Sequence, residues 1–295
     1  MDRRRFLTSC VAGSASLALA ACTKGGAFSA SGSIKIEFRM VGAAWHVQFA
    51  PDGTRYSVRP HEHRVVRHTA SGGEEAIGAF GTEPGQLNSP VDVHVSADGQ
   101  IYVLDRGNSR ILVFDRAGTF VREIGGDGAG ALGLPAGFDV AADGTIWVAD
   151  TRNHRVEVFA PDGTSRVIGE AGVGPTHLNA PRALALDGHG QVFVVDAGNA
   201  RIQVFAVDGR HLRSFGSYGR GSDQMIAPHA IAIHERRVFV ADPVGEAVLE
   251  FDVEGTFVAR HPGKTSAGAP GQPMDLGLAP NGELHIHAVP AHAGA

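Results

Sequence analysis

The sequence predicts an all-β fold, a six-bladed β-propeller of four-stranded antiparallel blades closed by the N-terminal strand. The first observation is a set of segments that begin with proline and alternate apolar with other residues, starting at Pro90, Pro135, Pro181, Pro228 and Pro273. These prolines are 45, 46, 47 and 45 residues apart, which indicates one unit repeated in tandem. The second observation is composition: 40 glycines and 15 prolines among 295 residues indicate many turns between short strands.

Each repeat contains signals for four strands. The proline segment is the first strand, and a turn that favours a hairpin follows it, mostly Asp98-Gly99, Asp143-Gly144, His189-Gly190 and Asn281-Gly282. Second strands are predicted over 101–105, 146–150, 192–196 and 238–242. Third strands are predicted over 111–114, 156–159, 202–205 and 248–251. Fourth strands are predicted over 120–124, 165–168, 211–215 and 256–259.

A degenerate copy precedes these repeats. Residues 44–53 align with the Pro90 segment 46 residues later, and 56–58 and 65–67 supply further strands. One four-stranded sheet cannot bury both of its faces. Six such sheets arranged radially bury each face against a neighbour, so six copies predict six blades.

The chain ends predict how the ring closes. After the strand at 283–288 too few residues remain for two more strands, whereas 34–40 alternates and ends like a fourth strand. We therefore expect 34–40 to join 274–289 in one blade, which would cover sheet edges that otherwise invite aggregation. The closing blade then has three or four strands, and with three its edge stays open to a partner strand.

Three repeats carry a recurring polar motif after the second strand. Its members are Asp105, Asn108 and Arg110, then Asp150, Asn153 and Arg155, then Asp196, Asn199 and Arg201. In this motif the chain resembles the NHL repeat, over residues 44–288, strongly in three copies, fairly in the fifth and weakly in the first and last. The resemblance implies a six-bladed propeller, here in an exported bacterial lipoprotein form.

A structural role is favoured for this motif over a catalytic one, because chemistry is rarely installed several times in one subunit. The aspartate can accept hydrogen bonds from loop amides, and the asparagine can adopt a left-handed turn conformation. The arginine can reach the aspartate as a fork onto a carboxylate. In the first and last copies Arg59 and Ala288 replace the aspartate.

The N-terminal residues read as a targeting segment. Arg3, Arg4 and Arg5 precede a short apolar run, which resembles a twin-arginine export signal over residues 1–21. Leu19 to Cys22 resembles a lipobox, so Cys22 is the predicted lipidation site. Residues 22–33 are predicted to be a flexible tether, 34–290 the propeller and 291–295 a short tail. The expected location is a membrane-anchored lipoprotein facing the periplasm or cell exterior.

The residues that follow the repeat prolines are the binding-site candidates. They should surround the mouth of the central channel, and they differ between blades while the strands do not. The predicted binding residues are Trp45, Arg182, His229 and Met274, whereas Val91 and Ala136 occupy the same position in two other blades.

The chain also resembles the peptidyl-hydroxyglycine amidating lyases in its expected fold. Those enzymes place zinc on histidines that follow the repeat proline in alternating blades. The zinc ligands do not match here, because only His229 is present, Ala136 and Trp45 cannot bind zinc, and His46 is displaced by one position. Weaker metal candidates are His61, His63, His285 and His287. No cofactor is predicted, and a divalent metal stays an alternative.

Composition and missing motifs narrow the function. A net charge of −5, from 26 basic and 31 acidic residues, with 7% aromatics, disfavours nucleic-acid binding. Two cysteines cannot form a disulfide scaffold, and a Gly-x-Ser-x-Gly motif is absent. We expect a scaffold or binding module that holds a protein or peptide of the cell envelope. The alternative is a metal-assisted lyase or lactone hydrolase that uses the same mouth.

Overall fold

The computed structural model describes residues 36–39, 46–126 and 130–291. Every described residue belongs to one compact unit, residues 34–295. Among the described residues, no helix has the length and hydropathy needed to cross a membrane. The expected export signal, the tether and Cys22 lie outside the described residues.

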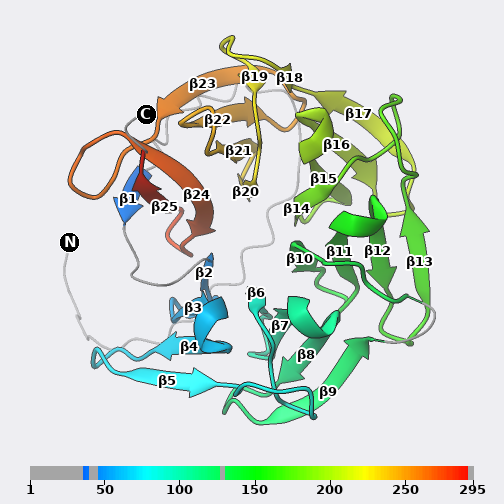
Figure 1. Cartoon of the computed structure of the whole chain (residues 1–295), viewed down its shortest axis with the longest axis vertical. Coiled ribbons are helices and arrows are strands. Elements are labelled where there is room, and N and C mark those ends of the chain that lie inside the picture. Colours follow the sequence, from blue (N-terminus) through cyan, green and yellow to red (C-terminus); the bar gives the residue numbers. More distant parts are fainter. Residues whose placement is uncertain (1–35, 40–45, 127–129, 292–295) are drawn as a thin grey trace, which may run out of the picture. The chain divides into compact units, whose positions relative to one another are not determined.

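Five antiparallel sheets of four strands follow one another along the chain (Figure 1). The first contains β2 (His46–Phe49), β3 (Arg55–Arg59), β4 (Arg64–His68) and β5 (Glu74–Ile77). The second contains β6 (Pro90–Val95), β7 (Ile101–Asp105), β8 (Arg110–Phe114) and β9 (Phe120–Gly125). The third contains β10 (Gly137–Val140), β11 (Ile146–Asp150), β12 (Arg155–Phe159) and β13 (Ser165–Ile168).

The fourth sheet contains β14 (Pro181–Leu186), β15 (Gln191–Asp196), β16 (Arg201–Ala206) and β17 (His211–Phe215). The fifth contains β20 (Ala230–His234), β21 (Arg237–Asp242), β22 (Ala247–Asp252) and β23 (Phe257–Pro262). A short parallel pair, β18 (Ser217–Tyr218) and β19 (Gln224–Met225), lies between these two sheets in the sequence and was not predicted. The chain is thus an all-β propeller, and the predicted second strands agree with the structure to within one residue.

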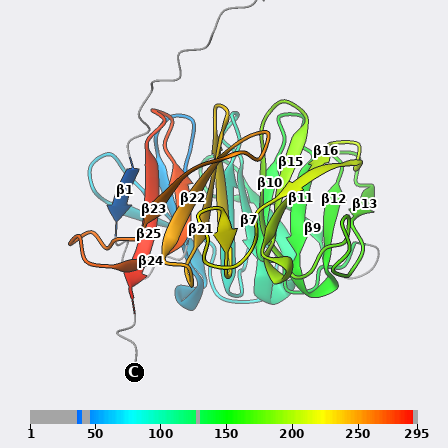
Figure 2. The ribbon, with the colours of Figure 1, turned by 90° about the horizontal axis from the view of Figure 1, so that it is seen from above.

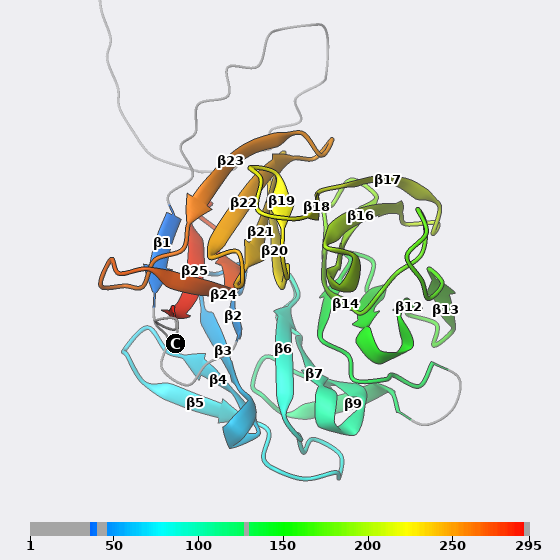
Figure 3. The ribbon, with the colours of Figure 1, turned by 45° about the horizontal axis from the view of Figure 1, so that its top comes forward.

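The sixth sheet has the smaller of the two strand numbers that the sequence left open, and it departs from the predicted antiparallel pairing. It has three strands in the order β1 (Ile36–Arg39), β25 (Leu284–Pro290) and β24 (Gly271–Leu278). β24 and β25 are antiparallel, but β1 pairs with β25 in parallel, with Ile36 opposite Leu284. The N-terminal strand does join the C-terminal sheet, as Figure 3 shows, but not within a four-stranded antiparallel blade.

The direction of β1 follows from its connection to the next strand. β2 begins at His46, a few residues after Arg39. Its first residue lies on the same face of the ring as the first residues of the other innermost strands. β1 therefore runs toward that face of the ring, as the fourth strand of a complete blade does. Because the described residues after β25 contain no further strand of this sheet, β1 lies directly beside β25 and parallel to it.

The core consists of apolar layers between neighbouring sheets. One layer joins Val58 of β3 to Ile101 of β7, and another joins Trp147 of β11 to Val192 of β15. The layer that includes Leu284 of β25 ties the sixth sheet to the fifth. Figure 2, turned by 90°, shows the sheets standing beside one another around the ring. Apolar layers thus join each sheet to the next from the first to the sixth, which is the packing that radial repetition requires.

Short 3-10 helices connect the second and third strands of four sheets. They are η1 (Pro60–Glu62), η2 (Arg106–Asn108), η3 (Thr151–Asn153) and η4 (Ala197–Asn199). The left-handed residue is the one after each helix, such as Ser109 with φ 55°, and not the asparagine. The expected left-handed asparagine was therefore wrong. Its side-chain amide instead donates to the motif aspartate, as Asn108 Nδ2 does to Asp105 Oδ2 at 2.7 Å.

The motif aspartates are fully buried beneath these helices. Asp196 Oδ1 accepts from the backbone N–H of Asn179 at 2.7 Å, and Oδ2 accepts from Asn199 Nδ2 at 2.9 Å and Arg201 Nε at 2.8 Å. The corresponding contacts recur around Asp105, with Asn108 and Arg110, and around Asp150, with Asn153 and Arg155. Each motif thus fixes the loop that enters the innermost strand to the end of the second strand.

Candidate functional site

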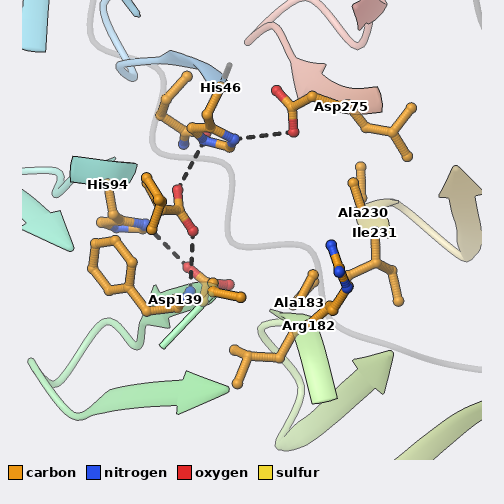
Figure 4. A pocket seen from close by; sticks show the side chains of 18 of the residues that line it. His46, His94, Asp139, Arg182, Ala183, Ala230, Ile231 and Asp275 are labelled. Atoms are coloured by element: carbon orange, nitrogen blue, oxygen red, sulfur yellow. Dashed lines mark hydrogen bonds and ion pairs between the residues drawn. The ribbon is translucent and has the colours of Figure 1, made fainter. Parts of the chain in front are cut away.

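The innermost strands of all six sheets surround a central cavity of about 340 Å³ (Figure 4). Arg182, His229 and Met274, three of the predicted binding residues, line it. The fourth, Trp45, lies outside the described residues. We call the end of the cavity where the innermost strands begin the mouth, and these three residues lie there because each directly follows a repeat proline.

A charged cluster lies one residue deeper, where the first and last sheets meet. The imidazole of His46 lies between two carboxylates, with Nδ1 3.0 Å from Asp275 Oδ1 and Nε2 2.9 Å from Asp92 Oδ1. Backbone groups hold the carboxylates from the neighbouring strands: Val47 N–H donates to Asp275 Oδ2 and Phe138 N–H donates to Asp92 Oδ2, both at 3.0 Å. The cluster therefore links four innermost strands, β24, β2, β6 and β10.

Electrostatics keeps His46 charged. Burial by itself lowers the pKa of His46, but the Asp275 and Asp92 carboxylates outweigh it and raise that pKa well above its ordinary value. For Asp275, burial acts to raise the pKa, but the imidazolium of His46 and the backbone N–H donors outweigh it and lower that pKa. At neutral pH the cluster is therefore an imidazolium between carboxylates.

The position of His46 corrects the expectation that a displacement of one residue turns its side chain away from the channel. The strand register shifts between Pro90 and Asp92 and again between Pro273 and Asp275. Because of these irregularities, the second residue after the proline contributes its side chain to the cavity, and His46 is equivalent to Asp92. Simple alternation therefore fails at the start of β6 and of β24.

A second histidine–aspartate pair lies farther along the cavity. His94 Nδ1 lies 3.0 Å from Asp139 Oδ1, and Leu186 N–H donates to Asp139 Oδ2 at 2.9 Å. Figure 4 shows His94 and Asp139 on the side of the cavity opposite Ala230 and Ile231. Among the described residues, His94 Nε2 has no hydrogen-bond partner, so this nitrogen is available to a molecule in the cavity.

The mouth carries two guanidinium groups. Arg182 is the first residue after its repeat proline, and Arg106 begins η2; both line the cavity. Burial and then the neighbouring charge of Arg106 lower the pKa of Arg182, although a guanidinium stays charged at any physiological pH. In the described part of the chain, neither side chain has a hydrogen-bond or ion-pair partner.

His229 lies beside these arginines and is neutral. Burial, followed by the charge of Arg182, lowers the pKa of His229 below its ordinary value. Its Nδ1 lies 3.1 Å from the carbonyl oxygen of Met274, which can only accept, so Nδ1 donates and Nε2 keeps its lone pair.

Small residues keep the other wall of the cavity open. Gly137, Ala183 and Ala230 hold the positions that Asp92 and Asp275 hold in other sheets. A Cβ on Gly137 would lie 2.9 Å from the carbonyl oxygen of Arg182, so glycine lets the third and fourth innermost strands approach closely. The cavity is therefore charged on one side and apolar on the other.

The weaker metal candidates do not form one site. His63 Nδ1 accepts from the backbone N–H of Ser89 at 3.0 Å, and the His285 ring stacks on Phe49 with centroids 4.7 Å apart. Burial lowers the pKa of His287, which lies beside Asp275 in the sheet. Within the described ranges, neither these residues with His61 nor any other three His, Cys, Asp or Glu side chains are grouped closely enough to hold a metal ion.

Sequence reasoning missed the acidic residues and Arg106. A signal was present, because Pro-x-Asp occurs at both 90–92 and 273–275, at the start of an innermost strand. The sequence carries no such signal for Asp139, because its place in the cavity depends on how β10 lies beside β14, the innermost strand of the next sheet.

The model of the NHL repeat matches three segments of the chain, residues 87–114, 132–159 and 178–205. Among curated proteins, the E3 ubiquitin-protein ligase TRIM32 of Homo sapiens is 50% identical over 48 residues, 16% of this chain. The match spans only 7% of the length of that protein.

Solved structures share the fold over most of the chain. A streptogramin B lyase structure superposes with a TM-score of 0.66 at 14% identity, covering 85% of this chain and 93% of that chain. A gluconolactonase from Xanthomonas campestris gives 0.65 at 18%, covering 85% and 84%. A chain of the nidogen/laminin complex gives 0.58 at 21%, covering 74% and 79%. At these identities the likeness is one of fold alone.

Proposed function

We propose that this chain, a β-propeller in which three segments match the NHL repeat, is a binding or scaffold module that holds a protein or peptide at the mouth of its central cavity. The observation that carries the proposal is the chemistry of the mouth. Arg182, His229 and Met274 bring a cation, a neutral imidazole and a thioether to one opening. Two other sheets have valine or alanine at this position, Val91 and Ala136, so the packing of the blades does not require these groups.

Two further considerations support binding over a purely structural role. The fold occurs in a structure of the nidogen/laminin complex, so related folds are found in protein assemblies. The mouth joins a charged wall and an apolar wall, and such a combination orients a ligand and supplies apolar contact area.

We also propose where in the cell the protein is located. The arginines at 3–5 and the lipobox ending at Cys22 support export and attachment of Cys22 to a membrane, so that the propeller meets partners in the cell envelope. The support for this location is the sequence of residues 1–22.

The test is binding by a variant that lacks the polar groups of the mouth. The R182A/H229A double variant is expected to bind N-terminally immobilised random octapeptides at least tenfold more weakly than the unaltered protein, because both groups face the bound chain. The measurement is retained fluorescence of the labelled protein over a concentration series. R236A is the matched control, because Arg236 is 73% exposed and pairs with Glu254 on the outside. Equal binding by the double variant and the control would contradict the proposal.

A second candidate, a lactone hydrolase or lyase acting in the same cavity, is favoured by the His94–Asp139 pair. Asp139 orients the ring of His94 and leaves Nε2 free to accept a proton, which is the arrangement of a general base. If the protein hydrolyses any of a panel of γ- and δ-lactones, H94Q is expected to lower kcat by about 100-fold or more. Absence of turnover over the panel, or an unchanged kcat in H94Q, counts against this candidate.

A further inference from the structure

We propose that the mouth recognises a carboxylate of the bound peptide, held between the guanidinium groups of Arg106 and Arg182. This inference rests on the proposed peptide-binding function and adds the chemical group that is recognised. The carboxylate belongs either to an acidic side chain or to the C-terminus of the peptide, and the experiment below separates these two sources.

The two arginines are distinguished by their place in the cavity. Arg116 and Arg236, in contrast, are exposed and pair with Asp52 and Glu254. Other arginines without an acidic partner in the described part of the chain, such as Arg122 and Arg152, are exposed and do not line the cavity. Arg106 and Arg182 line one cavity and, among the described residues, have no acidic partner. Two like charges beside one another repel, and an anion placed between them relieves that repulsion.

Arg106 is also not required by the repeat. The first residue of the 3-10 helix is Thr151 in the third sheet and Ala197 in the fourth, so the motif beneath it forms without a charge at this position. Thr151 donates its hydroxyl to the carbonyl oxygen of Pro181 at 2.7 Å, whereas the Arg106 side chain makes no such contact with any residue that the structure describes. Its guanidinium is therefore available to a ligand.

The charges deeper in the cavity limit the size of the anion. Asp92, Asp139 and Asp275 line the same cavity, and His46 compensates only part of their charge. A polyanion that extended into the cavity would meet these carboxylates. A single carboxylate held at the mouth meets both arginines first, and a planar guanidinium matches its two oxygens.

His229 and Met274 add contacts that a peptide can use. His229 Nε2 keeps a lone pair and, in the described part of the chain, has no hydrogen-bond donor opposite it. A peptide N–H beside the carboxylate would supply that donor. Met274 at the same opening offers a flexible apolar surface for a neighbouring side chain.

The experiment compares three sets of N-acetylated octapeptides immobilised through a lysine near their N-termini. One set ends in a free carboxylate and contains no Asp or Glu, the second is C-terminally amidated but contains Asp or Glu, and the third is amidated and has neither. The full-length protein and its R106Q, R182Q, R182K and R236Q variants are titrated onto each set. Their circular dichroism and thermal unfolding confirm that every variant is folded.

The inference predicts that one or both carboxylate-bearing sets bind at least tenfold more tightly than the third. R106Q and R182Q should each lose this preference by about tenfold or more, R182K should keep part of it, and R236Q should keep all of it. Preference for the first set alone assigns the C-terminus, and preference for the second alone assigns the side chain. Equal binding of all three sets overturns the carboxylate inference while leaving peptide binding intact, and binding of none overturns both.

Discussion

Replacing Asp275 by alanine is expected to lower the free energy of unfolding by about 3 kcal/mol, because the buried imidazolium of His46 loses one of its two carboxylate partners and a buried backbone N–H loses its acceptor. The substitution leaves His46 with Asp92 as its carboxylate partner and also removes the acceptor of Val47 N–H. These contacts connect β24 to β2, the innermost strands of the sixth and first sheets. Urea denaturation followed by tryptophan fluorescence measures the change.

This deficit should also depend on pH in a defined direction. The lowered pKa of Asp275 contributes stability that is present above its ordinary pKa and is lost as the pH falls through the lowered value. The raised pKa of His46 contributes stability that is fully present below its ordinary pKa and is lost as the pH rises through the raised value. The difference between unaltered protein and D275A should therefore be largest between about pH 4 and 6.5 and decrease on both sides.

The matched control is D52A. Asp52 forms an ion pair with Arg116, but both side chains are largely exposed to water. Exposed pairs contribute little to stability because water and salt screen them. If D275A and D52A unfold at the same urea concentration across this pH range, the buried cluster does not stabilise the closure.

Replacing Asp196 by alanine is expected to cost about 4 kcal/mol at pH 7, because its buried carboxylate satisfies several donors that would all lose their acceptor. These donors are the Asn179 backbone N–H, the side chains of Asn199 and Arg201, and Gln203 Nε2 at 3.1 Å. Arg201 would stay partly buried without its ion pair. The measurement is again the midpoint of urea unfolding, with the thermal midpoint as a second readout.

Asp208 provides the comparison for this substitution. It also accepts a backbone N–H, from Arg210 at 2.9 Å, but it lies in an exposed turn of the same sheet. D208A should therefore be much less destabilised than D196A. A D196A protein as stable as D208A would show that the motif aspartate is dispensable and would contradict its structural role.

The repeats made most of the fold predictable. Pro90, Pro135 and Pro181 mark equivalent points of successive sheets, and the strands that follow lie where alternation and turn residues place them. The closing sheet was only partly predictable, since the segment around Ile36–Arg39 was assigned to it correctly. Its parallel orientation became evident only from the connection to the innermost strand of the first sheet.

The site was less predictable than the fold. Arg182 and His229 could be named because their place in the repeat puts them at the mouth. His46 and Asp275 are 229 residues apart, so only the closed ring shows that they are partners. The two residues that follow the repeat proline both line the cavity, as Met274 and Asp275 do, and a strict period of two cannot represent this.

Photo-crosslinking from the mouth tests the central claim most directly. A benzoylphenylalanine replaces Met274 in one protein and Val121 in another; Val121 is an exposed residue of β9 on the outside of the ring. Each protein is irradiated with octapeptides that the unaltered protein retains, and the crosslinked adducts are measured by mass spectrometry. The account predicts adducts from position 274 that unlabelled competing peptide abolishes, and none from position 121. Adducts from position 121 alone, or equal and uncompeted adducts from both positions, would contradict it.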